Sequence, residues 1–391
     1  MIAASPFPLP RGSQVLIAGL ADSLHERGHR VEIATYPTGA DSPVPAVPVH
    51  RLRPTPLYRR LDPGPALSKP LLDLLLARKT LAVARRSRPD LLHAHNFEGL
   101  LVGLWVRRKT GVPVIYHLHN LMEPELPAYF RFRPGIWAGR WVGRWVDVHL
   151  PRRADACIAL HDEAAAHLRQ QGVAPERVHV VPPGVHLPET PPLPPAGLRR
   201  RRGRPDGPIV LYSGNLDRYQ DLDFLLEAFG QARAGCPEAT LVLATHQTQE
   251  TRYSRALQRT LGQGAYLLPT PSWDEMRGLL AAADVVVSPR QVCWGFPIKV
   301  LNYMAAGCPI VAAAGSAQGL RHMATAWIVP NGDVAAFARG IQRLLEDRDL
   351  AGRLGQAARS EVQYRHGWPT CARAIEQVYQ TVTATHVTVE R

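Results

Sequence analysis

Short apolar runs rich in β-branched residues alternate along the chain with longer segments that repeat apolar residues at helical spacing. Helical periodicity covers 14–27 and 69–88. A first strand at 1–4 has about four residues where 5 to 6 are usual, so either it is short or the chain starts upstream. The other apolar runs of the first half are continuous, which predicts strands buried on both faces of a parallel sheet. These runs lie at 31–36, 90–95, 112–119, 156–160 and 178–184.

The second half of the chain repeats this alternation. Its predicted strands are 208–214, 239–245, 265–269, 284–289 and 309–314. The stretch between the halves is too rich in proline and arginine for a packed element and indicates a linker. We therefore predict an α/β chain with two Rossmann-like, doubly wound domains that face a central cleft, with ligands at the carboxyl ends of the strands. The predicted parts are an N-terminal domain 1–186, a linker 187–207, a C-terminal domain 208–365 and a helix 366–391 that crosses back to the N-terminal domain.

Charge and composition narrow the classes of function. The 391 residues include 46 Lys and Arg against 33 Asp and Glu, a net charge of +13 that favours phosphate-bearing or other anionic partners. No nucleic-acid reader motif with interleaved aromatics accompanies this charge, so we expect no nucleic-acid partner. The five cysteines form no C-x-x-C pair, which predicts neither a zinc site nor disulfides and suits a reducing cytoplasm. The sequence shows neither a signal-peptide pattern nor an apolar run of about 18 to 20 residues.

The segment GFPIKVLNYMAAGCPIV (295–311) combines a turn with a helix start. Pro297 falls near the first helical position and Lys299 in the first turn, so backbone N–H groups and a cation would together bind a diphosphate. Helical spacing places Lys299, Asn302 and Tyr303 on one face. The alternative is a buried helix with a lysine that extends to solvent.

Four histidines alternate on two predicted strands. His93 and His95 share one face of their strand, and His117 and His119 share one face of the next. Four imidazoles could bind a metal, but no carboxylate has matching spacing, and we expect no metal. We expect His93 and His117 to be core residues with satisfied hydrogen bonds.

Two further segments could carry function. Gly12 and Ser13, in PRGSQ, form a glycine turn that leads into a helix, which either binds an anion or merely connects two elements. Trp137, Trp141 and Trp145 recur every four residues with Arg140 and Arg144 beside them. Such a row is typical of an interfacial helix on anionic lipid. The alternative is that the tryptophans are core packing or line an acceptor site.

Together with PDLLHAHN, VPVIYHLHN, RVHVVPPGV and IVLYSGNL, these segments resemble the GT-B-fold, family 4-like retaining glycosyltransferases (glycosyl transferases group 1) from about residue 6 to 379. The resemblance implies that a nucleotide sugar binds mainly on the C-terminal domain and the acceptor mainly on the N-terminal one. It implies His119 and Lys299 as catalytic residues, and Asn96 and Asn120 on the acceptor side. The implied donor-site residues are Gly12, Ser13, Gly214, Asn215, Arg218, Arg290, Gly295, Phe296, Pro297, Ile298, Lys299 and Asn302.

The chain departs from this family's pattern at four positions. The family's Glu-x7-Glu carboxylates fall at Trp294 and Asn302, its arginine at Asn215 and its lysine at Gln220. The cations that remain for a diphosphate are Lys299, Arg290 and Arg218.

From this resemblance we expect a metal-independent retaining transferase without a cofactor. It would move a hexose-type sugar from a nucleotide diphosphate onto a hydroxyl of a glycan or lipid-linked acceptor, in cell-surface polysaccharide or glycolipid synthesis. We expect it in the cytoplasm, in contact with the inner face of the membrane. The alternative is a catalytically silent module that binds a nucleotide sugar or glycan as an assembly partner.

Overall fold

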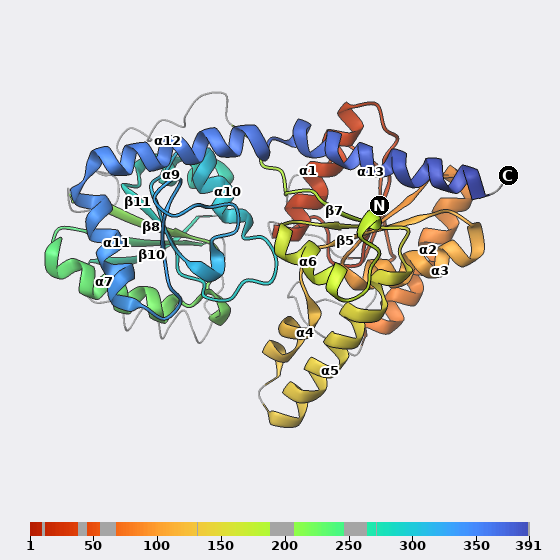
Figure 1. The fold of residues 1–391 in the computed structure, drawn as a ribbon, viewed down its shortest axis with the longest axis horizontal. Helices are drawn as coiled ribbons and strands as arrows, with labels where there is room; N and C mark the ends of the chain where they lie inside the picture. The colour runs from red at the N-terminus through yellow and green to blue at the C-terminus, as the bar shows by residue number, and fades with distance from the viewer. Residues whose placement is uncertain are drawn as a thin grey trace. The chain divides into compact units, whose positions relative to one another are not determined.

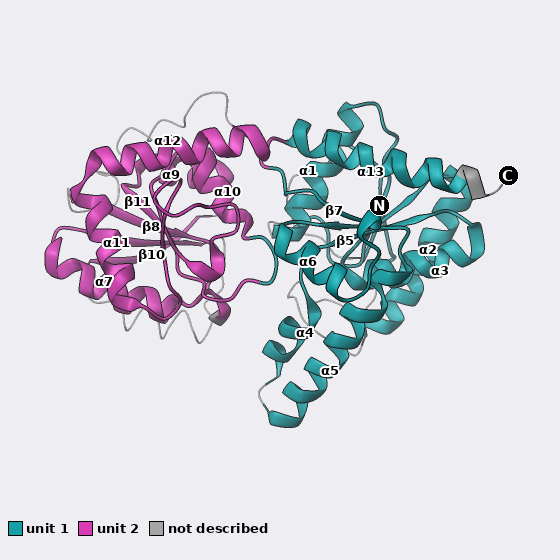
Figure 2. Ribbon diagram, viewed as in Figure 1, with its two compact units in different colours: residues 1–184, 294–296, 368–391 teal, residues 185–293, 297–367 magenta. Residues whose placement is uncertain are grey.

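The computed structural model describes residues 1–9, 12–37, 45–54, 68–130, 132–187, 207–245, 264–270 and 272–389. Most of the predicted linker, 188–206, lies outside these residues. The chain divides into two compact units (Figure 2). Unit 1 comprises 1–184, 294–296 and 368–391, and unit 2 comprises 185–293 and 297–367. The short segment 294–296 thus belongs with the N-terminal part of the chain, which the sequence did not predict.

Unit 1 contains a parallel sheet (Figure 1). Its described strands have the order β3-β2-β1-β4-β5-β6-β7. The five predicted strands are confirmed, and the first strand is short. The half-buried β3 was not predicted, because its three residues, VHR, make no apolar run. The strands are β1 (Ile2–Ala3), β2 (Ile33–Thr35), β3 (Val49–Arg51), β4 (Leu92–His95), β5 (Val114–Leu118), β6 (Ala156–Ala159) and β7 (Val178–Val180).

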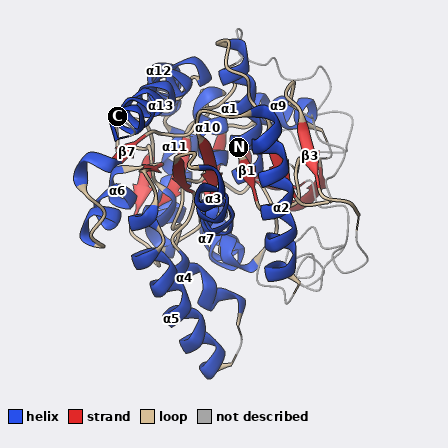
Figure 3. Ribbon diagram, turned by 90° about the vertical axis from the view of Figure 1, so that its right-hand side faces the viewer, coloured by secondary structure: helices blue, strands red, loops and turns tan. Residues whose placement is uncertain are grey.

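Helices cover this sheet (Figure 3). They are α1 (Gly12–Glu26), α2 (Lys69–Ser87), α3 (Asn96–Thr110), α6 (Asp162–Gln170) and α13 (Trp368–Val389). The last helix packs on the first: a Cβ atom at Gly19 would lie 2.2 Å from the Trp368 ring, and one at Gly184 would lie 2.3 Å from it. Glu376 of α13 also accepts hydrogen bonds from Arg27 (2.6 Å) and pairs with His29 (2.9 Å).

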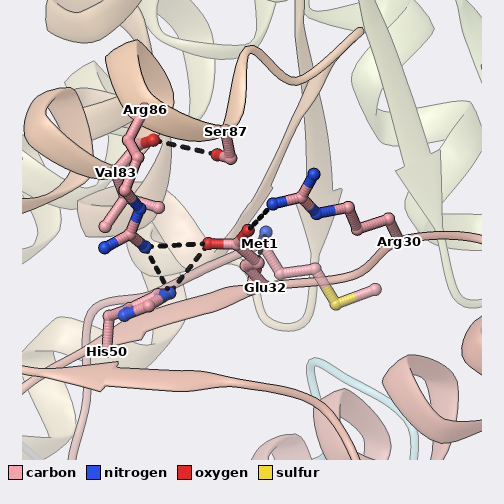
Figure 4. Close-up of polar contacts among 7 residues, drawn as sticks. All are labelled: Met1, Arg30, Glu32, His50, Val83, Arg86 and Ser87. Atoms are coloured by element: carbon pink, nitrogen blue, oxygen red, sulfur yellow. Dashed lines mark hydrogen bonds and ion pairs between the residues drawn. The ribbon is translucent and has the colours of Figure 1, made fainter.

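A polar group fixes the edge of the same sheet (Figure 4). Glu32 lies 2.8 Å from His50 Nε2 and 3.5 Å from Arg86, and so joins β2 to β3 and α2. These contacts hold the pKa of Glu32 below its ordinary value despite partial burial. The amino group of Met1 donates to the carbonyl of Glu32 at 2.7 Å. These bonds compensate the side chains for lost hydration at the sheet edge.

Unit 2 contains a second parallel sheet, with the described strands in the order β10-β9-β8-β11-β12-β13. The five predicted strands are confirmed, and β13 is additional. Ser272, Asp333 and Asp347 cap three helices by accepting backbone N–H groups. The strands are β8 (Ile209–Ser213), β9 (Thr240–Thr245), β10 (Ala265–Pro269), β11 (Val285–Ser288), β12 (Ile310–Ala313) and β13 (Trp327–Val329). The helices are α7 (Leu222–Gly235), α9 (Trp273–Ala282), α10 (Ile298–Ala305), α11 (Val334–Glu346) and α12 (Arg348–Arg365).

Each sheet has one point where the strand order reverses, which is where doubly wound sheets bind ligands. In unit 1 this point lies between β1 and β4, and in unit 2 between β8 and β11. The carboxyl ends of these four strands therefore locate the candidate site residues.

Candidate active site

The reversal point of unit 2 gathers several predicted donor-site residues. Gly214 directly follows β8 with φ of 143°, a conformation that glycine adopts without steric cost. Arg290 follows β11 after Pro289. Helix α10 begins at Ile298, with Pro297 as its cap residue. The sheet edge therefore combines a turn without a side chain, a helix N-terminus and a cation.

Lys299 lies in the first turn of α10 and is half-buried. Its Nζ donates to Gln220 Oε1 at 2.8 Å and lies 4.3 Å from the centroid of the Tyr212 ring. Burial, and secondarily the charge of Arg290, lower its pKa to about 7. Because these two contacts are neutral, the ammonium charge stays available to an anionic ligand, and it would be stabilised by one.

Two amides stand where the family resemblance implies cations. Gln220 donates from Nε2 to Asn215 Oδ1 at 2.8 Å, and Asn215 donates from Nδ2 to Asp217 Oδ2 at 2.8 Å. A hydrogen-bonded chain therefore runs from Lys299 through both amides to a carboxylate. Sequence reasoning missed Gln220 as a contact of Lys299. The sequence did contain a signal for this contact, because amides replace both family cations, at positions 215 and 220.

The other predicted residues of unit 2 differ in burial and in their contacts. The Arg290 guanidinium lies 4.8 Å from the Tyr219 ring centroid and donates to the Val292 carbonyl at 2.7 Å. Asn302 is half-buried on α10. The expectation for Tyr303 is wrong: its side chain is fully buried, and its hydroxyl is bonded to Ser213 at 3.0 Å. The side chain of Arg218 lies outside the described residues.

Gly295 and Phe296 belong to unit 1, where Gly295 contacts the two residues that follow β5. A Cβ at this glycine would lie 2.0 Å from Asn120 Oδ1 and 2.4 Å from the His119 carbonyl oxygen. Only a residue without a side chain permits this approach. This contact lies within unit 1, between residue 295 and the two predicted site residues that directly follow β5.

The remaining predicted residues of unit 1 lie around its reversal point. Gly12 and Ser13 are the first residues of α1, and the Ser13 hydroxyl donates to Gln14 Oε1 at 3.0 Å. The preceding Pro10 and Arg11 lie outside the described residues. Asn96 begins α3 directly after β4 with φ of 61°, a left-handed conformation that asparagine tolerates better than most residues. This places Asn96 at the carboxyl edge of the sheet.

The four histidines form one buried, hydrogen-bonded stack. His93 Nε2 lies 3.0 Å from His117 Nδ1, and His95 Nδ1 lies 3.0 Å from His119 Nε2. His93 Nδ1 also lies 2.6 Å from the hydroxyl of Tyr379 on α13, so both of its ring nitrogens have partners. His117 was expected to be satisfied in the same way, but its Nε2 has no partner among the described residues.

Burial lowers the pKa of His119 to about 4 and holds the pKa values of the other three well below the ordinary range. The stack is therefore neutral at pH 7. Ring nitrogens of His93, His95 and His117 lie within 4.8 Å of one another, a spacing that could suit a metal. The His93 and His95 rings are stacked at 15°, and both ring nitrogens of His93 already have hydrogen-bond partners, so His93 would have to give up one of these bonds to bind a metal.

The tryptophan row lies on α5 (Arg133–His149) and faces away from the core. Trp137, Trp141 and Trp145 are 72%, 61% and 44% exposed. The interpretation of these residues as core packing is therefore wrong. None of the described helices is long and apolar enough to cross a bilayer.

Known proteins share this architecture of two parallel-sheet α/β domains. Residues 11–184 match the glycosyl transferase 4-like domain, and residues 207–347 match the glycosyl transferases group 1 family. The chain belongs to this glycosyltransferase family.

Individual relatives cover nearly the whole chain. The D-inositol 3-phosphate glycosyltransferase of Streptomyces scabiei is 29% identical over 96% of this chain and 87% of its own length. The protein of the same name from Xylanimonas cellulosilytica is 29% identical over 95% and 92%. Among solved structures, sucrose-phosphate synthase of Thermosynechococcus elongatus has a TM-score of 0.81 at 23% identity, covering 98% of each chain. HepE of Anabaena, in complex with UDP and glucose, has a TM-score of 0.76 at 21% identity, covering 97% of this chain and 98% of its own. These likenesses show the GT-B fold.

Proposed function

We propose that the protein transfers a hexose-type sugar, with retention, from a nucleotide diphosphate sugar to a hydroxyl of a glycan or lipid-linked acceptor. The observation that carries the proposal is Lys299, in the first turn of α10 and held by Gln220 beside Gly214. A helix N-terminus, a cation and a turn without a side chain suit a diphosphate. The presence of UDP-glucose in a HepE complex supports this class of donor.

In the proposed mechanism the acceptor hydroxyl attacks the face of the sugar from which the diphosphate departs. The acceptor proton passes to the departing β-phosphate oxygen, so no side-chain base is required. The protein positions the two substrates and stabilises the charge that develops on the diphosphate. Lys299 and the N–H groups of α10 are the groups assigned to that charge.

The neutral histidines suit a role on the sugar. His119 follows β5 at the carboxyl edge of its sheet, and its backbone lies against Gly295. A neutral imidazole can donate a hydrogen bond to a sugar hydroxyl without adding a charge. We assign His119 to the donor sugar, and Asn96 and Asn120 to the acceptor side. A lipid-linked acceptor would bring the protein to the inner face of a membrane, for polysaccharide or glycolipid synthesis.

A catalytically silent module that binds a nucleotide sugar or glycan is the second candidate. Trp294 and Asn302 replace two carboxylates of the family pattern, and the amides at 215 and 220 replace two cations. Donor hydrolysis without acceptor separates the two functions. A transferase should hydrolyse its donor slowly, and Lys299→Ala should reduce that rate at least tenfold, or about 1.4 kcal/mol. The exposed Arg353→Ala is the matched control. Donor binding without hydrolysis or transfer across a panel of nucleotide sugars would favour the silent module.

A further inference from the structure

Helix α5 presents an apolar row to solvent. Trp137, Trp141 and Trp145 succeed one another on one side of the helix, and Phe132, just before its first residue, is 60% exposed. We use the name tryptophan face for this surface, whose members are Trp137, Trp141, Trp145, Arg133, Arg140 and Arg144. Exposed aromatics at this density are unusual on a surface without a partner.

Arginines run along the same side of α5. Arg133, Arg140 and Arg144 are exposed. At 100° per residue Arg140 and Arg144 lie within about 60° of Trp137, so the cationic and aromatic rows adjoin. None of these three arginines forms an ion pair with a residue that the structure describes. The face therefore combines apolar area with uncompensated positive charge.

The opposite side of α5 fixes this orientation. Gly139 and Gly143 pack against the segment formed by α4 (Met122–Glu125) and η1 (Leu126–Tyr129), and a Cβ at Gly143 would lie 2.3 Å from the Met122 carbonyl. Gly135 packs against the Phe130 and Phe132 rings. Asp147 accepts the backbone N–H groups of Met122 and Glu123 at 3.0 and 2.8 Å. The pair of segments projects from the sheet of unit 1 (Figure 1). Rotation of the tryptophans inward would break these contacts.

We propose that the tryptophan face docks in the head-group layer of an anionic phospholipid bilayer. Tryptophan is the side chain that prefers the membrane interface, because its ring is apolar and its N–H can stay hydrated. The adjoining arginines meet lipid phosphates, and the charge complementarity selects an anionic lipid surface over a neutral one. The inference deepens the proposed function, on which it rests for a lipid-linked acceptor. It concerns a different element from the donor site.

The test is binding to vesicles of phosphatidylglycerol and phosphatidylcholine, compared with pure phosphatidylcholine, at low and high salt. We expect the full chain to sediment with the anionic vesicles, and Trp141→Ala/Trp145→Ala to bind at least tenfold more weakly. Arg140→Gln/Arg144→Gln should lower the affinity for anionic vesicles about fivefold per arginine. This factor corresponds to the roughly 1 kcal/mol that a basic residue contributes near such a surface. High salt should weaken the parent more than this second variant.

Matched controls lie on unit 2. Trp273→Ala removes a tryptophan that is 49% exposed on α9, and Arg339→Gln/Arg353→Gln removes the same charge from exposed positions. Neither should change vesicle binding, and thermal melts should show every variant folded.

Equal binding by parent and face variants, or no binding by the parent at low salt, would overturn the proposal. Concentration-dependent dimers that only the tryptophan variant abolishes, without lipid binding, would make the face a contact between two copies instead. Donor hydrolysis measured on the same variants distinguishes failure of this proposal from failure of the proposed function.

Discussion

Replacing Lys299 by arginine should remove a pH dependence that the parent shows in donor binding. The Lys299 pKa of about 7 means that, as pH rises through 7, the free protein loses the ammonium proton. A bound diphosphate favours the charged form and raises that pKa. Affinity is therefore greatest below pH 7 and falls as pH rises. If the bound form stays protonated to pH 9, the loss between pH 6 and pH 9 is about 2.7 kcal/mol, or about hundredfold in Kd.

Isothermal titration with UDP-glucose, the ligand of the HepE complex, measures this dependence. Its diphosphate is a diester and does not titrate in this range, and the comparison with Lys299→Arg removes the contribution of other titrating groups. Titrations at pH 8 in buffers of different ionisation enthalpy should show uptake of about 0.9 proton per ligand, because about ten in eleven free molecules are deprotonated there. Lys299→Arg stays charged throughout. Its binding should be nearly flat with pH, whereas the exposed Lys109→Arg should behave like the parent. A parent affinity that is constant from pH 6 to 9, or an unchanged slope in Lys299→Arg, would refute the reasoning.

Three further predictions test other parts of the site. Gly295→Ala places a methyl group 2.0 Å from Asn120 Oδ1, so the turn must shift, and steady-state kinetics should show kcat at least tenfold lower with little change in melting temperature. The buried histidines have lowered pKa values, so the unfolded state takes up more protons below pH 6.5. Below that pH, the free energy of unfolding measured in urea should fall by up to about 1.4 kcal/mol per buried histidine for each pH unit. His95→Gln should show a smaller pH dependence of this free energy, and a pH dependence equal to that of the parent would contradict the prediction. Asn302→Glu should keep nucleotide binding, because both side chains accept hydrogen bonds from ribose hydroxyls; loss of binding in a titration would mean that this position contacts an anionic group.

The strand pattern was predictable because buried parallel strands are continuous apolar runs, and every such run became a strand. The exceptions have local causes. β3 is half-buried and contains His50 and Arg51, so it carries no apolar run. Segment 294–296 belongs to unit 1 through a close contact at Gly295, and spacing along the chain does not contain that information.

The candidate site was predictable where a motif carries its own geometry. A proline and a lysine at positions 297 and 299 predict the start of α10, and the structure places both residues there. The bond between Lys299 and Gln220 joins residues 79 positions apart, and the bond between His93 and Tyr379 spans 286. Such partners follow from the tertiary fold alone. The burial of Tyr303 had the same origin, because its hydroxyl is bonded to Ser213 on β8.

The measurement that tests the central claim most directly is proton NMR of a nucleotide sugar incubated with the purified protein and an acceptor hydroxyl. UDP-glucose is the first donor, followed by other nucleotide hexoses. We expect loss of the donor's anomeric signal, release of the nucleoside diphosphate and a new anomeric signal with the same configuration as in the donor. We also expect at least a tenfold lower rate for Lys299→Ala. A product of inverted configuration would contradict the proposed mechanism, and binding of the donor with no transfer or hydrolysis would contradict the proposed activity.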